Sequence, residues 1–264
     1  MANPKTFHFK LPRYTGPLLP EPPHAWYPGV QAVHSSSTSD RTLHGDGHVR
    51  AFVIHATDGV SSSGAMSVMF EGRGSWHWLI PDENEPEHKQ KIWACAPEKR
   101  AAWHVQNSKS HPDVNGGKRF VNYWSLGVEI VNTMDSDPYS EWQLKMVADL
   151  IRYAWSKYPN LRDVVSHAKL DPQRRSDPGK DFPWDRLKNM VLAPVPESDF
   201  EPLSLADVAP LRILGPDGEE IDCDPHFDDG VSVAHVRPLV EALGFEVHYE
   251  EGPPRTMHIQ GGGG

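Results

Sequence analysis

Apolar runs of strand length alternate with polar loops and helical segments along most of the chain. Residues 49–55 form one such run, and residues 125–132 form a second that only Glu129 interrupts. Val164 and Val165 form a shorter apolar run that reads as another buried strand. Further strand-like segments are 75–80, 91–95 and 101–105.

Helical patterns lie between these runs. Ser140 is placed to cap a helix whose apolar residues recur at helical spacing until Asn160. Shorter helices are expected within 61–70, where a Ser-Gly turn precedes apolar residues, and within 184–191. Because buried strands alternate with helices, the pattern predicts an α/β domain with a mixed β-sheet flanked by helices.

Proline-rich segments indicate that the chain is divided into four parts. Residues 1–45 are rich in Pro, Ser and His and predict an extended N-terminal arm. Residues 46–192 form the main domain, and residues 193–208 form a Pro-rich linker. Residues 209–260 predict a small ββαββ-like accessory module of the α+β class.

The accessory module is expected to hold two hairpins around one helix. The first hairpin pairs residues 211–214 with 220–223 across a Gly-rich turn. The helix spans residues 233–243, and Gly244 follows it as a C-cap. The second hairpin pairs 245–249 with 255–259, where apolar and polar residues alternate.

Composition narrows the classes of function. The net charge of -10 and the lack of a Lys/Arg-rich run argue against a nucleic-acid partner and against electrostatic attraction to membranes. Cys95 and Cys223 lie too far apart in sequence to form a disulfide framework or a CxxC metal knuckle. No signal peptide and no membrane-spanning run is visible, so cytoplasmic synthesis is expected, and the oligomeric state is left open.

Two strand ends and one loop carry side chains that suit a metal ion. His55 closes the first apolar run, His167 follows Val165, and Asp177 lies ten residues later on a Pro-broken loop. Two imidazoles and one carboxylate fit a tetrahedral zinc with one position left for water. The alternatives are a histidine that faces the core and an aspartate that only caps the Pro-Gly turn.

Two charged residues are candidates for the chemistry around such a metal. Glu129 lies in an apolar strand, where an unpaired carboxylate is costly to bury, and burial would raise its pKa towards the range of a general base. Arg175 lies two residues before Asp177, so an extended backbone would point its charge towards the same place. A solvated edge position for Glu129 and a loop salt bridge for Arg175 are the alternatives.

The motifs that carry a family resemblance follow one another in a fixed order over about residues 50–190. They are Val53-Ile54-His55, Ser75-Trp76-His77-Trp78-Leu79-Ile80, Ala102-Trp103-His104, Asn122 with Ser125-Leu126-Gly127-Val128-Glu129-Ile130, Val165-Ser166-His167, and Asp177-Pro178-Gly179 with Phe182 and Trp184. This ordered set resembles the zinc-dependent N-acetylmuramoyl-L-alanine amidases, a family shared by cytosolic anhydromuropeptide amidases, phage lysozyme-type amidases and peptidoglycan recognition proteins.

The resemblance implies a cofactor and a reaction. His55, His167 and Asp177 would bind zinc, Glu129 would act on the catalytic water, and Arg175 would steady the oxyanion. The implied reaction hydrolyses the amide between N-acetylmuramic acid and L-alanine of the stem peptide in peptidoglycan or muropeptides. The residues implied to contact this substrate are Trp76, His77, Trp103, His104 and Asn122.

Two departures from the family pattern bear on the mechanism. Arg175 occupies a position that is often Lys in the family, and Trp76 stands where some members carry a catalytic Tyr. The alternative function is therefore a recognition protein that binds muropeptides without cleaving them, against which Glu129 and the three ligands argue. An endolysin released to act on the cell wall and a wall-recycling enzyme both suit the chain. The C-terminal module resembles the small N-terminal domain of copper amine oxidases, which implies binding or spacing. The alternative is an appendage that serves packing or dimerisation.

Overall fold

The computed structural model divides into two compact units, Met1–Ala193 and Pro194–Gly264, and each unit is described by itself. The residues that the structure describes are 2–25, 37–85, 90–194, 212–214, 245–250 and 256–261.

The first unit contains helices, short 3₁₀ turns and strands. Its α-helices are α1 (Ser62–Phe70), α2 (Glu141–Lys157), α3 (His167–Leu170) and α4 (Trp184–Leu192). Its 3₁₀ turns are Pro4–Thr6, Arg41–Leu43, Asn115–Gly117 and Val121–Trp124. Its strands are β1 (His8–Lys10), β2 (His24–Ala25), β3 (Thr38–Asp40), β4 (Ala51–Ala56), β5 (Trp78–Ile80), β6 (Ile92–Ala94), β7 (Arg100–Ala102), β8 (Ser125–Ile130) and β9 (Asp163–Ser166).

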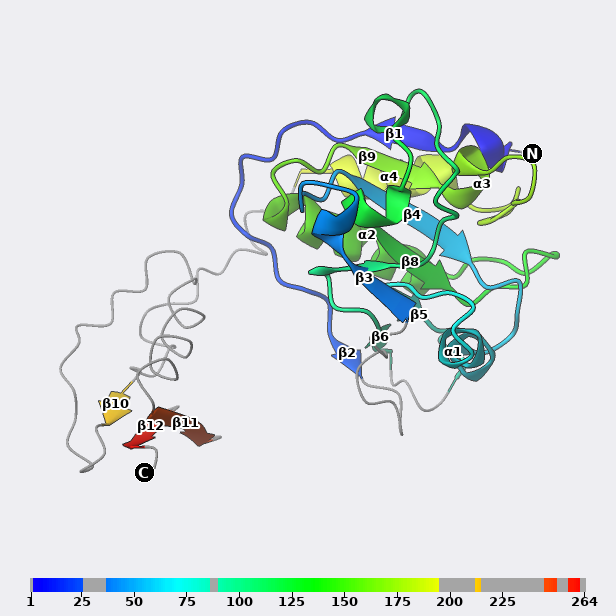
Figure 1. The fold of residues 1–264 in the computed structure, drawn as a ribbon. Coiled ribbons are helices and arrows are strands. Elements are labelled where there is room, and N and C mark those ends of the chain that lie inside the picture. The colour runs from blue at the N-terminus through cyan, green and yellow to red at the C-terminus, as the bar shows by residue number, and fades with distance from the viewer. Residues whose placement is uncertain are drawn as a thin grey trace. The chain divides into compact units, whose positions relative to one another are not determined.

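A 7-stranded mixed sheet forms the centre of this unit, in the order β1-β9-β4-β8-β5-β6-β2 (Figure 1). The four strands β9, β4, β8 and β5 are mutually parallel, so their carboxyl ends meet at one edge. β1 and β6 are antiparallel to their neighbours β9 and β5. This confirms the predicted α/β class with a mixed sheet flanked by helices, and it creates a strand edge of the kind where α/β proteins bind ligands.

The alternation of side chains along the central strands separates a core face from a site face. Phe52 and Ile54 of β4 are fully buried in the cluster that α2 and α4 cover. Val53 belongs to a different cluster, on the opposite face. Since side chains alternate along a strand, His55 shares the face of Val53. Glu129 lies beside His55 in the register of β4 and β8, so it points to the same face.

Two short segments of residues 1–45, which the sequence predicts to be an extended arm, are strands of this sheet. They supply both of its edge strands, β1 and β2 (Figure 1). Between the two strands, the backbone N–H of Leu11 donates to the carbonyl of Arg162 at 2.8 Å, and the indole of Trp155 donates to the carbonyl of Pro12 at 2.9 Å. Both edge strands are very short, three and two residues, which limits pairing with other chains.

Local capping signals in the sequence are confirmed. Ser140 caps α2, and its side chain and that of Gln143 form a capping box in which each accepts a backbone N–H. Ser61 caps α1 by accepting from the N–H of Gly64. The expected strand 75–80 is shorter in the structure, because only β5 makes ladder pairs.

The prediction that a loop follows His167 is wrong for the first residues of that segment. His167 opens the short helix α3 instead, because the Ser166 side chain accepts the N–H of Lys169 at 3.1 Å and caps the turn. The sequence signal was present, since Ser is a preferred N-cap, but the nearby prolines outweighed it.

The second unit contains a 3-stranded sheet in the order β10-β12-β11. Its strands are β10 (Arg212–Leu214), β11 (Phe245–Glu250) and β12 (Thr256–Gly261). β11 and β12 pair antiparallel, which confirms the hairpin predicted for 245–249 and 255–259, and β10 runs parallel to β12. The predicted partner strand 220–223 and the helix 233–243 lie outside the described residues, and the resemblance to copper amine oxidases stays a prediction.

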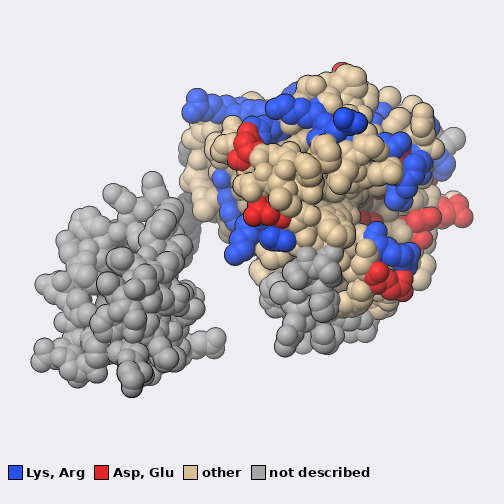
Figure 2. All heavy atoms as spheres, viewed as in Figure 1, with Lys and Arg blue, Asp and Glu red and all other residues tan. Residues whose placement is uncertain are grey.

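Two surface properties bear on the partners of the protein. Among the described residues, none of the helices combines the length and the apolar character needed to cross a membrane. The acidic net charge of -10 does not make the whole surface acidic, because Lys and Arg side chains spread across the face of the first unit shown in Figure 2. Local contacts with anionic groups are therefore possible despite the net charge.

A buried carboxylate joins the N-terminal strand to the sheet. Asp163 of β9 is 2% exposed, and its Oδ1 lies 2.7 Å from His8 Nε2 and also accepts from Lys10 Nζ. Its Oδ2 accepts the backbone N–H of Asn115 at 3.2 Å. Burial opposes ionisation of Asp163, but the hydrogen bonds from His8 and Lys10 outweigh it and lower the pKa of the carboxyl.

We expect Asp163→Asn to lower the free energy of unfolding by about 1–3 kcal/mol, because the substitution leaves buried donors poorly paired. The pKa of this carboxyl is lower in the folded protein than in the unfolded chain, where it is about 3.9. Its ionised form therefore stabilises the fold fully above pH of about 3.9, and this contribution is lost as the pH falls through the pKa of the folded protein. Urea unfolding at neutral and at acid pH measures both effects. Asp135→Asn is the control, since Asp135 is exposed. A difference between mutant and parent that does not shrink at acid pH would contradict the assignment.

Candidate metal centre

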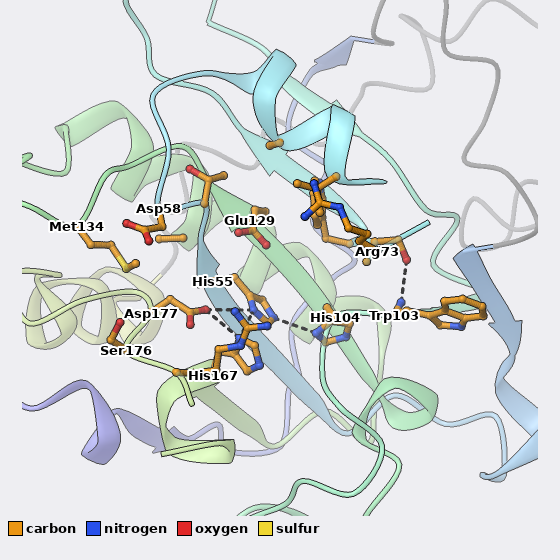
Figure 3. Close-up of a pocket in the computed structure, with 18 of the residues that line it drawn as sticks. His55, Asp58, Arg73, Trp103, His104, Glu129, Met134, His167, Ser176 and Asp177 are labelled. Carbon is orange, nitrogen blue, oxygen red and sulfur yellow. Dashed lines mark hydrogen bonds and ion pairs between the residues drawn. The ribbon is translucent and has the colours of Figure 1, made fainter. Parts of the chain in front are cut away.

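Three donor atoms from distant parts of the chain converge at the carboxyl edge of the sheet (Figure 3). His55 Nδ1 lies 3.0 Å from His167 Nδ1 and 3.3 Å from Asp177 Oδ2. His167 Nδ1 lies 3.0 Å from the same carboxylate oxygen. All three side chains are buried. The structure thus brings together the three ligands that the sequence predicts.

Local structure explains this convergence. His55 is near the end of β4, and His167 opens α3 directly after β9, the strand beside β4. The backbone N–H of Ala168 donates to the carbonyl of Asp177 at 3.0 Å, which ties the loop back against α3. A second loop bond, from Gly179 N–H to the carbonyl of Ser176 at 2.8 Å, closes the turn around Asp177.

The donor set fits a tetrahedral metal ion. Bonds of about 2.0–2.2 Å from zinc to nitrogen or oxygen place neighbouring ligands about 3.3 Å apart, close to the separations of these three atoms. Burial, followed by the neighbouring His167, lowers the pKa of His55 to about 4 and keeps the ring neutral. Burial opposes ionisation of Asp177, but the two imidazoles hold the pKa of this carboxyl well below its usual value. Two imidazole nitrogens and one carboxylate oxygen are a ligand set for a divalent cation.

Glu129 lies in the same cavity as this cluster (Figure 3). It projects from β8 beside His55, and no hydrogen bond to its carboxylate is found among the described residues. Burial raises the pKa of Glu129 well above its ordinary value, the Asp177 carboxylate raises it further, and Arg175 partly lowers it. A carboxyl that holds its proton more tightly than usual is suited to accept and return a proton near neutral pH.

Two adjoining cavities give access to the cluster. The first has a volume of about 410 Å³ and contains His55, Glu129, His167 and Asp177. The second has a volume of about 460 Å³ and also reaches His167. The residues that line both cavities are Arg73, Trp103, His104, His167, Arg174 and Arg175. A ligand that extended from one cavity into the other would pass His167.

Arg175 is exposed and lines both cavities, as expected for a charge near the metal. Its backbone N–H donates to the carbonyl of Asp171 at 3.0 Å, which fixes its place on the loop. Its positive charge reaches into the cavity, since it lowers the pKa of both Glu129 and His55.

Three of the predicted substrate-contact residues are aromatic residues or histidines that line the cavities. Trp76 is buried in the wall of the first cavity. Trp103 is 41% exposed and borders both cavities, with its indole N–H donating to Ser39 Oγ at 2.9 Å. His104 also borders both cavities but is only 9% exposed. Trp103 is therefore the residue best placed to contact a ligand with its ring.

The other two predicted contacts serve the framework. His77 is 1% exposed and lines neither cavity, because its Nδ1 accepts the N–H of Gly127 at 2.9 Å and its Nε2 donates to the carbonyl of Arg100 at 3.1 Å. The expected substrate contact by His77 is thus corrected to a structural role. Asn122 lines the second cavity, but its side chain is engaged by the backbone of Val105 through both amide atoms, each at 2.8 Å.

Sequence reasoning missed two arginines at the cavities. Arg174 donates to Gln106 Oε1 at 2.6 Å and to Asp171 Oδ2 at 3.1 Å, and it lines both cavities. Arg73 follows α1 and lines both cavities as well. The neighbouring Arg175 could have drawn attention to Arg174, whereas no spacing in the sequence connects Arg73 with the site.

Curated proteins similar to this chain are bacterial amidases. The N-acetylmuramoyl-L-alanine amidase AmiD of Escherichia coli is 29% identical over 174 residues, which are 61% of this chain and 60% of that protein. The 1,6-anhydro-N-acetylmuramyl-L-alanine amidase AmpD of Salmonella typhimurium is 30% identical over 120 residues, which are 45% of this chain and 58% of that protein. The chain thus spans about three-fifths of the length of these relatives.

Two solved structures match part of this chain. A crystal structure of an AmpD derivative gives a TM-score of 0.47 at 22% identity, covering 66% of this chain and 99% of that one. A complex of AmiD from Escherichia coli with anhydro-N-acetylmuramic acid-L-Ala-D-gamma-Glu-L-Lys gives 0.47 at 23% identity, covering 76% and 78%.

The sequence profile of one family matches residues 45–180, more than half of the chain. This match contains every member of the metal cluster together with Glu129 and Arg175. The C-terminal unit lies outside it. The chain therefore belongs to the N-acetylmuramoyl-L-alanine amidase family.

Proposed function

We propose that the protein is a zinc-dependent amidase that hydrolyses the bond between the lactyl group of N-acetylmuramic acid and the L-alanine of the stem peptide. Its substrates would be peptidoglycan or muropeptides released from it. One observation carries the proposal, namely that Glu129 projects from the strand next to His55 into the cavity of the metal cluster. Membership of the amidase family supports the choice of reaction.

The ligand set favours zinc among the common divalent ions. Two imidazoles and one carboxylate leave one position of a tetrahedral ion for water or substrate, which is the pattern of catalytic zinc sites. Calcium and magnesium prefer sets made of oxygen ligands. When bound, zinc supplies Lewis acidity, which polarises a carbonyl group and acidifies water.

Glu129 would move the proton in both halves of the reaction. Its carboxylate accepts the proton of the attacking water, and the resulting acid returns that proton to the departing amine of L-alanine. The raised pKa of Glu129 favours this use, because an ordinary carboxyl is too weak a base near neutral pH. Family members often carry Lys where this chain has Arg175. Since arginine does not release a proton in proteins, Glu129 would perform both transfers here.

Arg175 would stabilise the charge that develops on the carbonyl oxygen. It lines both cavities and its charge already influences Glu129 and His55 across the first one. A fixed cation close to a developing oxyanion stabilises the transition state more than the ground state. Trp103, exposed at the border of both cavities, offers an aromatic face to the substrate beside this charge.

We expect the metal-free protein to bind one zinc ion, and we expect His55→Ala, His167→Ala and Asp177→Ala to lose this binding. Zinc affinity should fall in each variant by more than about 10–100-fold, the weakening that is typical when a residue hydrogen-bonded to a metal ligand is removed. Competition titration against a chromogenic chelator measures the affinity. His48→Ala is the matched control, since His48 is exposed. Unchanged zinc affinity in any of the three variants would remove that residue from the ligand set.

Glu129→Gln is expected to lower kcat by about 10²–10⁴-fold, because the amide keeps the shape of the side chain but cannot take up a proton. The release of free L-alanine amino termini from purified peptidoglycan and from muropeptides measures the rate, with and without a chelator. Glu141→Gln, on the exposed start of α2, is the control.

The same assay separates cleavage from recognition. A protein that only binds muropeptides would release no amino termini before or after the Glu129 substitution, although it would still retain the ligand. An unchanged rate in Glu129→Gln would refute the proposed proton transfer.

Arg175→Ala is expected to lower kcat by about 10²–10³-fold, while Arg175→Lys keeps most of the activity because it keeps the charge. Steady-state kinetics on a soluble muropeptide and thermal unfolding are measured together. If Arg175 only makes a loop salt bridge, Arg175→Ala would lose thermal stability without losing kcat.

A further inference from the structure

A chain of hydrogen bonds leads from the metal centre into the body of the protein. His55 Nε2, the ring nitrogen that faces away from the other ligands, lies 3.0 Å from His104 Nδ1 (Figure 3). His104 Nε2 in turn lies 3.1 Å from Ser125 Oγ. The Ser125 hydroxyl donates to the backbone carbonyl of Val121 at 2.7 Å.

The last bond sets the direction of the whole chain. The carbonyl oxygen of Val121 can only accept, so the hydroxyl proton of Ser125 must point to it. Ser125 Oγ then offers only a lone pair to His104, whose Nε2 must carry the proton. In a neutral imidazole the other nitrogen is unprotonated, so His104 Nδ1 accepts the proton of His55 Nε2. This leaves the lone pair of His55 on Nδ1, which faces His167 and Asp177.

We propose that His104 and Ser125 are positioning residues that hold His55 in the tautomer required of a metal ligand before any metal arrives. Metal-bound histidines commonly donate their other N–H to a partner that fixes the ring, and such partners are usually carboxylates or carbonyls. Here the partner is a second neutral imidazole, whose own tautomer is set by a hydroxyl. His104 thereby changes from a predicted substrate contact to a support of the metal centre. The purpose of the arrangement rests on the proposed zinc binding.

The surroundings of His104 keep it in place for this role. A Cβ atom at Gly127 would lie 2.7 Å from His104 Nδ1, so only glycine leaves room for the ring against β8. Asn122 Oδ1 accepts the backbone N–H groups of His104 and Val105, at 3.2 and 2.8 Å, and fixes the segment that carries the ring. His55 is 2% exposed and His104 is 9% exposed, so water competes little for these bonds.

His167 differs from His55 in this respect. Its Nδ1 faces the cluster, but among the residues that the structure describes its Nε2 has no hydrogen-bond partner. Of the two histidines, it is therefore His55 whose ring is oriented by a hydrogen bond on the nitrogen that faces away from the cluster. A test of the inference should change the tautomer of His55 and leave that of His167 alone.

Nuclear magnetic resonance of the full-length, metal-free protein with isotope-labelled histidine tests the inference directly. The pattern of long-range nitrogen–hydrogen couplings shows which ring nitrogen carries the proton, and His55→Ala identifies the signals of His55. We expect His55 and His104 both to be protonated on Nε2. Protonation of His55 on Nδ1 in the parent protein overturns the inference, whatever the variants do.

Two substitutions of His104 then separate positioning from simple packing. In His104→Asn the amide oxygen takes the place of the accepting Nδ1, so the His55 tautomer and the zinc affinity should stay close to those of the parent. In His104→Leu the acceptor is lost, so the Nδ1–H form of His55 should appear and zinc should bind about 10–100-fold more weakly. Ser125→Ala should act in the same direction through His104. Equal zinc affinity in His104→Asn and His104→Leu, with both folded, would refute the positioning role.

The outcome is independent of catalysis. If the protein binds zinc and shows the expected tautomers but cleaves no muropeptide, the proposed function fails and the inference stands. If it cleaves muropeptides while His104→Leu keeps the parent zinc affinity and tautomer, the inference fails and the proposed function stands.

Discussion

The candidate metal centre depends on the convergence of three buried donor atoms from distant parts of the chain. His55 Nδ1, His167 Nδ1 and Asp177 Oδ2 lie within 3.0–3.3 Å, and no side chain of the described residues supplies a positive charge between them. A cation bound by these atoms would tie the three segments together and would stabilise the fold around them. The charges of the neighbouring groups suit such an ion. Burial keeps His55 neutral, and the two imidazoles keep Asp177 charged.

The parallel part of the sheet provides the rigidity that such a cluster requires. β9, β4 and β8 are neighbours with a common direction, so His55, His167 and Glu129 emerge at one edge without any adjustment of loops. Asp177 is the one ligand carried by a loop, and that loop is tied to α3 by a backbone hydrogen bond. The N-terminal residues close both outer edges of the sheet, which leaves its carboxyl end as the open side of the unit.

Protons have separate, assigned places in this site. Burial raises the pKa of Glu129, which suits the proposed proton transfer, and Arg175 places a positive charge beside it. The chain from His55 through His104 to Ser125 holds its protons in fixed positions, away from the cavity where Glu129 lies. In the proposed site, Glu129 would move a proton while His104 and Ser125 would keep His55 oriented, and this division accounts for the histidine that lies beside the cluster without belonging to it.

The sequence by itself predicted the fold class, the strands that carry the site and the three side chains that converge there. Apolar runs that end in a polar residue mark the carboxyl ends of buried strands, and parallel strands bring such ends together. It did not determine the role of the N-terminal residues, because strands of two or three residues carry no readable alternation. Nor could it separate His77 from His104, since both lie in similar Trp-His motifs. Only the tertiary structure decided that His77 bonds to the backbone of Gly127 and Arg100 whereas His104 bonds to His55 and Ser125, because hydrogen-bond partners distant in sequence are set by packing and not by local pattern.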